Sequence, residues 1–466
     1  MTEKLQKSMR DSAVMRWIAL GLISLTMFFA YFFVDVAAPL KTLLEQDPYF
    51  WSNETFGMLG GSEFFLNVFA GFLILSGIIL DKMGIRFTLR LSGALMLIGG
   101  TIKWYALTTG FAETGFAQTL DSFIPAVPAS AKLAFFGFAI FGVGVEMAGI
   151  TVSKTIVKWF KGKELALAMG LEMAIARLGV FAVFQLSPIF AKEGGVSNSV
   201  FFGVLFLIVG FLTFLIYTFM DKKLDKETGG IELAPEDEFK ISDLGKILSN
   251  PGFLAIAGLC VLFYSAIFPF QKFATEMLSS KLNVEIELAS RYVSYFPIGA
   301  MALTPVIGAI LDYFGKGATM MIYGAILLTI SHLIFALVPE ASFTPAVAIL
   351  TIVILGTAFS LVPASMWPSI PKIVEDRYLG SAYGLIFYIQ NIGLLLVPIL
   401  IGFALSTSNP GVAEQIQQGV EGAKYNYTVP ELIFAGFGVA AFFLGIVLKM
   451  IDKKKGYGLD MPNKKK

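Results

Sequence analysis

The stretch GIILDKMGIRFTLR (Gly77–Arg90) returns in a shorter form as GAILDYFGKG (Gly308–Gly317), and this repeat decides the fold. Both copies follow the pattern G-x-x-x-D-x-x-G, and each comes directly after the second long apolar segment of one half of the chain. The aspartates, Asp81 and Asp312, stand where these segments end, and a carboxylate there can contact a helix terminus or a basic group. The repeat therefore predicts two related halves built in the same order.

The apolar segments around the two copies are long enough to cross a membrane. Hydrophobic residues make up 56% of the 466 residues and charged residues 15%, against roughly 25% charged residues in soluble domains. Because about 20 consecutive apolar residues span the hydrocarbon core, we predict an all-α membrane protein of twelve transmembrane helices in two pseudo-symmetric six-helix bundles. The predicted spans are 17–40, 56–80, 88–109, 132–157, 165–190, 200–220, 252–275, 290–311, 318–338, 344–367, 379–405 and 430–451.

A polar segment, 221–250, separates the two halves. It is rich in charge and contains a Gly–Gly pair and a proline, so we expect an aqueous linker with a short surface helix. The bundles are then 1–220 and 251–466, the second ending in a short basic tail. Lys and Arg gather in the segments on the side of both termini, whereas the opposite loops hold few. This bias predicts that both termini and the linker are cytoplasmic.

Two charges of opposite sign interrupt neighbouring spans. Glu146 lies within 132–157 and Arg177 within 165–190, on either side of a basic turn at 158–164. Each charge is about 13 residues from the turn, or about 20 Å along a helix, so the two should lie at similar depth. Charges at the bilayer centre are costly and mark functional sites by default. We expect a substrate-binding site there; the alternative is a structural ion pair that holds the two helices together.

Composition argues against several other classes of protein. The net charge of +1 gives no reason to expect a nucleic-acid partner. The single cysteine, Cys260, and the single histidine, His332, cannot build an all-protein His/Cys metal site, and we interpret both as packing residues. The sequence has no nucleophile elbow, phosphate loop or catalytic constellation, so we predict neither an enzyme nor a cofactor.

The repeated stretch resembles the signature loop of the major facilitator superfamily, whose full pattern ends in basic residues. This resemblance implies a transporter built from parallel six-helix repeats. It also implies a gate, away from the substrate, at Asp81, Gly84, Arg86, Arg90, Asp312 and Gly315. The alternative is that these are simple loop charges that hold the topology.

Three further stretches resemble a narrower family. They are WFKGKELALAMGLEMAIARLG (159–179), AIFPF (266–270) and SMWPSIPKIVEDRYLGSAYGLIFYIQNIGL (365–394). With the stretch around Glu146, they are similar to the animal family of major facilitator superfamily domain-containing protein 1, which comprises lysosomal dipeptide uniporters. The resemblance implies that Glu146 and Arg177 grip the two ends of a dipeptide.

The sequence departs from that family at two places. An arginine early on the fourth helix is replaced by Phe138, and the first sixteen residues lack a dileucine sorting signal. We therefore expect a bacterial inner membrane rather than a lysosome. We also expect a monomer in the lipid bilayer, with a small zwitterionic substrate as its partner.

Secondary candidates for substrate contact are aromatic residues and amides. Tyr31, Tyr264 and Tyr295 fall on helices that line the cavity in this superfamily, although aromatic residues also serve as filler or as belt anchors. Gln390 and Asn391, near the middle of the eleventh span, either contact substrate from the opposite half or join helices.

Four other residues have weaker expectations. Trp367 lies at an inner helix end, where it is an interfacial anchor or, by the resemblance, part of a gate. Glu172 is five residues from Arg177 and should face another direction on the helix. Asp35 and Glu63 lie in the outer parts of their spans, where we expect contact with water.

The expected mechanism is alternating access in uniport. The first span has only Asp35 and lacks the E-x-x-E-R motif of proton-coupled peptide transporters, and the fifth lacks the G-P-x-x-G-G run of drug–proton antiporters. The alternatives are a carrier of single organic anions or amino acids, with or without proton coupling, and a sensor that keeps a transporter fold but moves nothing.

Overall fold

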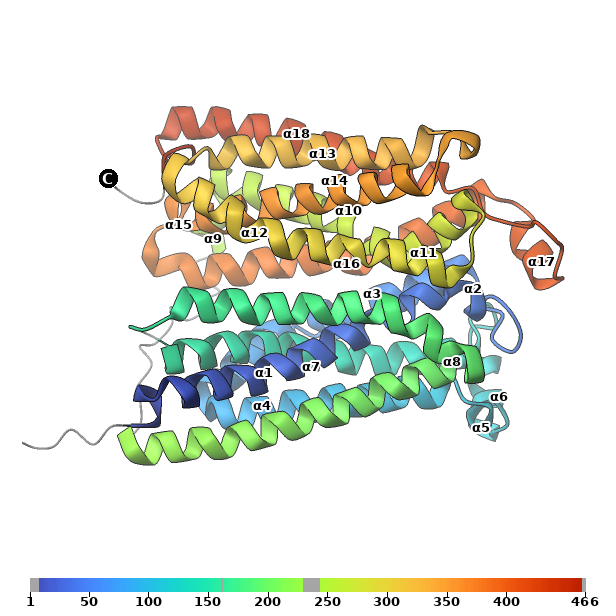
Figure 1. Cartoon of the computed structure of the whole chain (residues 1–466), viewed down its shortest axis with the longest axis horizontal. Coiled ribbons are helices and arrows are strands. Elements are labelled where there is room, and N and C mark those ends of the chain that lie inside the picture. The colour runs from blue at the N-terminus through green and yellow to red at the C-terminus, as the bar shows by residue number, and fades with distance from the viewer. Residues whose placement is uncertain (1–7, 161, 229–243, 463–466) are drawn as a thin grey trace, which may run out of the picture.

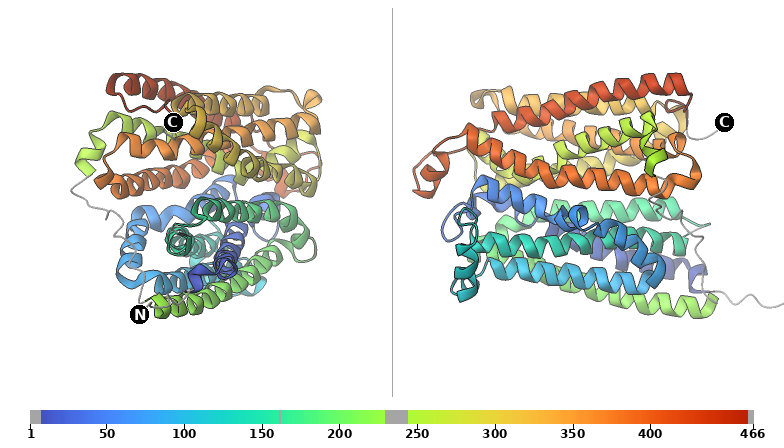
Figure 2. Two further views of the ribbon diagram at one scale, coloured as in Figure 1. Left: turned by 60° about the vertical axis from the view of Figure 1, so that its left-hand side comes forward. Right: turned by 180° about the vertical axis from the view of Figure 1, so that it is seen from behind.

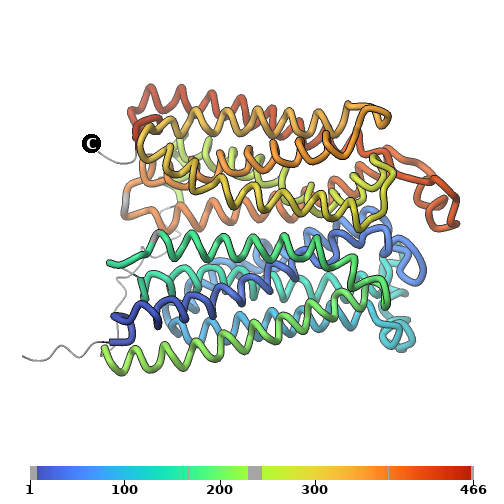
Figure 3. Tube along the Cα trace, viewed as in Figure 1, coloured from blue at the N-terminus to red at the C-terminus, as the bar shows by residue number. Residues whose placement is uncertain are grey.

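The computed structural model describes residues 8–160, 162–228 and 244–462. Its helices form two bundles that lie side by side, one from each half of the chain (Figure 1, Figure 3). No strand occurs in the described residues. The first and last described residues lie at the same end of the molecule, here called the termini end (Figure 2).

The first bundle uses serine and threonine caps to start several helices, as with Ser12 before α1 and Ser52 before α3. Its elements are η1 (Met9–Asp11), α1 (Ala13–Val34), η2 (Ala38–Leu40), α2 (Lys41–Leu44), α3 (Asn53–Phe69), α4 (Phe72–Ala106), α5 (Thr109–Ala112), α6 (Gly115–Ser122), α7 (Ala129–Phe160) and α8 (Leu165–Thr228).

The second bundle begins with Asn250, whose side chain accepts hydrogen bonds from the first backbone amides of α10. Its elements are α9 (Leu244–Leu248), α10 (Pro251–Leu282), α11 (Ile286–Val293), α12 (Tyr295–Phe314), α13 (Gly317–Leu337), η4 (Glu340–Ser342), α14 (Pro345–Met366), η5 (Trp367–Ser369), α15 (Ile370–Ile373), η6 (Asp376–Tyr378), α16 (Leu379–Ser408), α17 (Val412–Gln417) and α18 (Thr428–Lys455).

Glycines break two of the longest helices. Gly84 has φ 78° inside α4, and Gly195 has φ 65° inside the 64 residues of α8, a region that suits glycine because it has no Cβ. Figure 1 shows α8 turning back on itself at this point. The predicted count of twelve spans requires these two divisions and stays a prediction. If α4 and α8 are not divided, nine helices in the described ranges are long and apolar enough to cross a membrane, or ten if the bent pair α3 and α4 forms one span.

The predicted linker, 221–250, is shorter in the structure. α8 continues to Thr228, so the first eight residues of that segment are helical, and Asp221 is buried inside the bundle. α9 supplies a short helix before Pro251. Residues 229–243 lie outside the described ranges.

The outer surface of the bundles carries large apolar side chains. Phe219 on α8, Val306 on α12 and Phe443 on α18 are more than half exposed. Exposed apolar surface on this scale marks contact with something other than water. Because helices satisfy their own backbone hydrogen bonds, such a bundle is suited to lipid.

The bundles contact each other most closely between α3 and α16, at the end opposite the termini. A Cβ on Gly57 or Gly61 of α3 would collide with the carbonyl oxygen of Pro398 or Leu395, and one on Gly402 would collide with that of Asn53. We call this region the sealed end. Glycine is therefore required on both helices for this close approach.

Polar contacts between the bundles also gather at the sealed end or near the middle of the helices. The residue pairs include Lys41–Glu276, Asn53–Ser406, Phe184–Ser290, Gln185–Ser294, Lys192–Glu287, Asp35–Lys272, Asp35–Gln271, Val34–Lys272, Glu63–Lys272 and Val68–Tyr388. They hold the two halves together from the sealed end to about the middle of the helices.

His332 is more than the packing residue that we predicted. It is fully buried in the second bundle, and its Nδ1 lies 2.7 Å from a carboxylate oxygen of Glu431, which joins α13 to α18. Cys260 is buried, as predicted, and its thiol donates to the side-chain oxygen of Gln390.

Candidate functional site

A cavity of about 310 Å³ lies between the two bundles. Glu146 and Arg177 line it from the first half, and Tyr264 and Gln390 line it from the second. Met173, one turn from Arg177 toward the termini end, lines the cavity and is 59% exposed. The cavity is therefore open toward the termini end and closed toward the sealed end.

Glu146 reaches the cavity because α7 packs tightly against its neighbours. A Cβ on Gly142, one turn away, would collide with the carbonyl oxygen of Glu63 on α3. Glycine at this position lets the two helices touch, so Glu63 and Glu146 both line the same cavity. The run of small residues in α7 thus sets the position of both acids.

Arg177 lies in an aromatic cradle that both bundles supply. Its guanidinium carbon is 6.0 Å from the ring centre of Tyr31, 5.6 Å from that of Phe268 and 5.0 Å from that of Phe359. Rings at these distances favour a cation without hydrogen-bonding it. Arg177 forms no salt bridge in the described ranges, although the carboxyl of Glu172 is close enough to interact with its charge, and Arg177 lines the cavity.

Glu146 and Arg177 lie at similar depth by residue count but form no salt bridge with each other in the described structure. Glu146 is 17 residues from the start of α7 at Ala129, and Arg177 is 17 residues before the break at Gly194. The structural ion pair offered above as an alternative is therefore not formed in this conformation.

The other predicted contacts divide between the cavity and its surroundings. Tyr31, Tyr264, Gln390 and Trp367 line the cavity. The indole N–H of Trp367 donates to the hydroxyl of Tyr264 at 3.2 Å, so this residue is part of the cavity wall. Asn391 is buried behind the wall, and Tyr295 is 40% exposed outside it.

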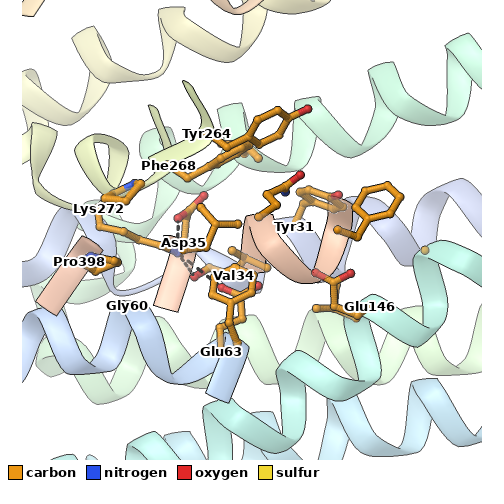
Figure 4. Close-up of a pocket in the computed structure, with 18 of the residues that line it drawn as sticks. Tyr31, Val34, Asp35, Gly60, Glu63, Glu146, Tyr264, Phe268, Lys272 and Pro398 are labelled. Atoms are coloured by element: carbon orange, nitrogen blue, oxygen red, sulfur yellow. Dashed lines mark hydrogen bonds and ion pairs between the residues drawn. The ribbon is translucent and has the colours of Figure 1, made fainter. Parts of the chain in front are cut away.

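Asp35 and Glu63 are buried, contrary to the expected contact with water. Sequence reasoning also missed their partner, Lys272 of α10, whose ammonium lies 2.7 Å from Asp35 and 3.9 Å from Glu63. It also donates to the carbonyl oxygen of Val34 at 3.0 Å. Figure 4 shows this group on one side of Tyr31 and Glu146 on the other.

Lys103 is a second buried cation that sequence reasoning did not single out. It lies on α4 in the first bundle and is 1% exposed. Its ammonium is 3.6 Å from the ring centre of Phe138 and 5.2 Å from that of Phe33. Phe138 stands where the resembling family carries an arginine. Its ring contacts the ammonium of Lys103 from the neighbouring helix.

A buried charge group closes the sealed end. Lys41 bonds Glu45 on its own side and Glu276, 2.7 Å away, on the other bundle. The hydroxyl of Tyr427 donates to Glu276 as well. All three charged side chains are at most 4% exposed, so each depends on the others for compensation.

The first copy of the repeated loop makes its contacts within its own bundle. Asp81 accepts from Lys154 at 2.6 Å, and Arg86 pairs with Asp221 and Asp225 of α8. Arg90 donates to Thr218 at 3.4 Å, and Gly84 supplies the break in α4.

The second copy has a different partner, the tail that follows α18. The backbone N–H groups of Lys316 and Gly317 donate to the carbonyl oxygens of Asp460 and Leu459. A Cβ on Gly315 would collide with this tail segment, so the glycine is needed for the contact. Asp312 lies at the end of α12, just before Gly315.

A cavity midway along two related helical bundles, closed at one end by contacts between them, is the architecture of a membrane carrier. The class is therefore a multi-pass membrane transporter. The sequence profile of the Major Facilitator Superfamily matches residues 20–398 and 273–460, and the chain belongs to this family.

Similar proteins agree with this assignment. The lysosomal dipeptide transporter MFSD1 of Mus musculus is 27% identical over 84% of this chain and 80% of its own length. A more distant relative, the probable anion transporter 2, chloroplastic, of Oryza sativa subsp. japonica, is 24% identical over 76% of this chain and 64% of its own length. A crystal structure of a variant of the nucleoside transporter NupG aligns with a TM-score of 0.71 at 13% identity, over 92% of this chain and 99% of that one, which shows the fold alone.

Proposed function

We propose that this transporter carries dipeptides, which bind between Glu146 and Arg177 and are exposed to each side of the membrane in turn. The observation that carries the proposal is one acid and one guanidinium at the same depth in one cavity, with no salt bridge between them in the described structure. A zwitterion brings one opposite charge to each of them.

The chemistry of the two groups fits the two ends of a peptide. A guanidinium offers a planar fork that can hold a carboxylate with two hydrogen bonds. The carboxylate of Glu146 can accept an ammonium group. A cavity of about 310 Å³ is at the small end of the range for ligand sites, which suits two residues better than a long peptide.

The relatives support the same substrate class. The mouse relative is a dipeptide transporter by name, and it aligns over most of both chains. Glu146 and Arg177 stand at the positions that the resemblance associates with the two ends of a dipeptide.

The test measures binding to the purified protein by thermal stabilisation against dipeptides, amino acids and organic acids. A ligand at 100 times its dissociation constant should stabilise the protein by about 2.7 kcal/mol. Arg177→Ala should weaken dipeptides by two to three orders of magnitude, since loss of one partner of a buried charge pair costs about 3–5 kcal/mol. Glu146→Gln should weaken free dipeptides but scarcely affect their N-acetylated forms.

Arg291→Ala is the matched control, because Arg291 pairs with Glu287 at the surface and lies outside the cavity. Folded Arg177→Ala and Glu146→Gln proteins that bind free and acetylated dipeptides as the parent does would refute the proposal.

We propose uniport as the mode of transport, because the first span lacks the proton-coupling motif described above. Proteoliposomes with equal dipeptide on both sides and an imposed pH gradient test this point. Net accumulation of dipeptide against its own gradient would establish proton coupling instead, with Glu146 as the first group to examine.

A second candidate is a carrier of single organic anions, held by Arg177 alone. The rice relative, a probable anion transporter by name, favours it. Under this alternative, organic acids and N-acetylated dipeptides bind as well as free dipeptides, and Glu146→Gln has no effect on either. The same binding panel therefore separates the two candidates.

For the setting of this activity we propose a monomer in a bacterial inner membrane, with both termini in the cytoplasm. The orientation is supported by the distribution of Lys and Arg between the two sides. Light scattering of the detergent-solubilised protein tests the monomer. Protease protection of a C-terminal tag in sealed vesicles tests the orientation.

A further inference from the structure

The cavity contains a second acidic group that a zwitterion held by Glu146 and Arg177 leaves free. Glu63 lines the cavity and is 5% exposed, yet its Oε2 has no hydrogen-bond partner among the described residues. Its ion pair with the ammonium of Lys272 is long, at 3.9 Å. A buried carboxylate oxygen without a hydrogen bond is costly, so its position in the cavity wall needs an explanation.

The neighbouring cations do not supply that partner in the described structure. Lys272 is held by Asp35 at 2.7 Å and by the carbonyl oxygen of Val34 at 3.0 Å, and the side chain of Gln271 donates to Asp35 at 3.0 Å. Lys103 has its ammonium 3.6 Å from the centre of the Phe138 ring. The carboxylate of Asp35 thus accepts hydrogen bonds from Lys272 and Gln271. Glu63 has charged neighbours, but none of them donates a hydrogen bond to its Oε2.

We propose that Glu63 forms a side-chain subsite that selects dipeptides carrying a long cationic side chain, lysine or arginine. This inference rests on the proposed function, in which Glu146 and Arg177 hold the peptide's own two ends. The incoming ammonium or guanidinium donates to Glu63, while Lys272 stays with Asp35. The subsite thus adds a third polar contact, specific to one class of dipeptide.

The depth of the residues sets the length of side chain that fits. Glu63 is ten residues from the start of α3, and Lys272 is ten residues from the end of α10, whereas Glu146 and Arg177 are 17 residues from the sealed end. Gly142 of α7, which touches the backbone of Glu63, is four residues from Glu146 toward the sealed end, or about 6 Å along the helix. A substrate held at the level of Glu146 therefore reaches Glu63 only with a long side chain that points toward the sealed end.

Reaching this subsite also links binding to the closed end of the cavity. Asp35 and Glu63 belong to the first bundle and Lys272 to the second, so the charges around the subsite take part in the contact between the bundles. A cation on Glu63 adds opposite charge to this junction without displacing Lys272 from Asp35. Because the cation reduces the negative charge that attracts Lys272 to the first bundle, the cationic dipeptide should weaken the closure of the sealed end.

The experiment compares affinities for a ladder of alanine dipeptides whose second residue carries diaminopropionate, ornithine, lysine, norleucine or acetyl-lysine. Parent protein should bind the lysine dipeptide at least about tenfold more tightly than the norleucine and acetyl-lysine forms, since hydrogen bonds to charged groups contribute more than neutral ones. The short diaminopropionate form should show no such gain. This series of dipeptides tests the subsite in the parent protein alone, so the test remains possible even if a Glu63 variant does not fold.

Glu63→Gln should remove the preference for lysine over norleucine and leave the affinity for Ala-Ala within about twofold of the parent. Glu172→Gln is the matched control, because Glu172 lies near Arg177 on α8 but does not line the cavity, and it should keep the preference. Equal binding of lysine and norleucine dipeptides by the parent would overturn the subsite. So would a Glu63→Gln protein that keeps the preference or loses Ala-Ala binding equally. Failure of every dipeptide to bind would instead overturn the proposed function.

Discussion

The two ends of the molecule are held by different kinds of contact. At the sealed end, the bundles touch backbone to backbone through Gly57, Gly61 and Gly402, and a fully buried lysine bridges carboxylates from both halves. At the termini end, the described ion pairs of the repeated loop stay within one bundle and are partly exposed, as with Asp81, whose side chain is 45% exposed. The stabilising contacts described at the sealed end therefore lie between the bundles, whereas those at the termini end lie within a bundle.

This difference teaches where a change will act. A substitution at the sealed end alters the balance between conformations, since it affects contacts that exist only when the bundles meet. A substitution at the termini end of the first bundle alters contacts within that bundle and leaves the separation of the two bundles unchanged. Three variants break or sharpen this comparison.

The largest effect is expected for Lys41→Met. Without the ammonium, Glu45 and Glu276 are two buried carboxylates with no cation between them, which costs about 3–5 kcal/mol. The melting temperature should fall by several degrees or more. Lys154→Met is the control at the termini end, where loss of an exposed pair costs about 0–1 kcal/mol. Equal melting shifts in the two variants would show that the ends do not differ in this way.

A smaller effect is expected for Gly61→Val. The added side chain meets the carbonyl of Leu395, and overpacking of this kind costs about 1–3 kcal/mol against the sealed conformation. In the Gly61→Val protein, a cysteine placed at Ser406 should react faster with a membrane-impermeant thiol reagent than in the parent background. Cys260 is buried and should not react.

Gly21→Val is the matched control, because nothing lies within 4 Å of a Cβ at Gly21 on α1. If the cysteine at position 406 is labelled at the same rate in the Gly61 and Gly21 variants, the contact between α3 and α16 does not close the sealed end.

The smallest effect on stability is expected for Asp81→Asn. Its pair with Lys154 is exposed, so the change should cost about 0–1 kcal/mol. Dipeptide affinity should stay within about twofold, because Asp81 is far from the cavity, while transport into proteoliposomes should slow if this loop is a gate. A loss of affinity comparable to that of Arg177→Ala would place Asp81 in the binding site instead.

Much of the fold was predictable because long apolar runs have one solution in a membrane. The ends of α13 and α14 fall within one residue of the spans 318–338 and 344–367. The bounds were worse where a helix continues past its apolar run. α10 extends to Leu282, seven residues beyond the predicted span 252–275, and α8 extends to Thr228.

The same extension hid part of the site. With the span ending at 275, Lys272 looks like an interfacial residue, but in the structure it is ten residues inside α10. The signal that found Glu146, a charge within an apolar run, would also have found Lys103. It could not have paired Lys272 with Asp35, since the two are 237 residues apart and meet only when the bundles pack.

The tail over Gly315 has a consequence for how the chain is made. The first loop's partners, Asp221 and Asp225, leave the ribosome only after the whole first bundle, and the second loop's partner, Asp460, only after α18. Asp81 of the first loop can pair with Lys154 of α7 earlier, but each loop completes its contacts only when all of its own half has been synthesised. For the second half, this makes the residues after Lys455 part of the bundle, so a truncation or a fused tag belongs beyond Pro462.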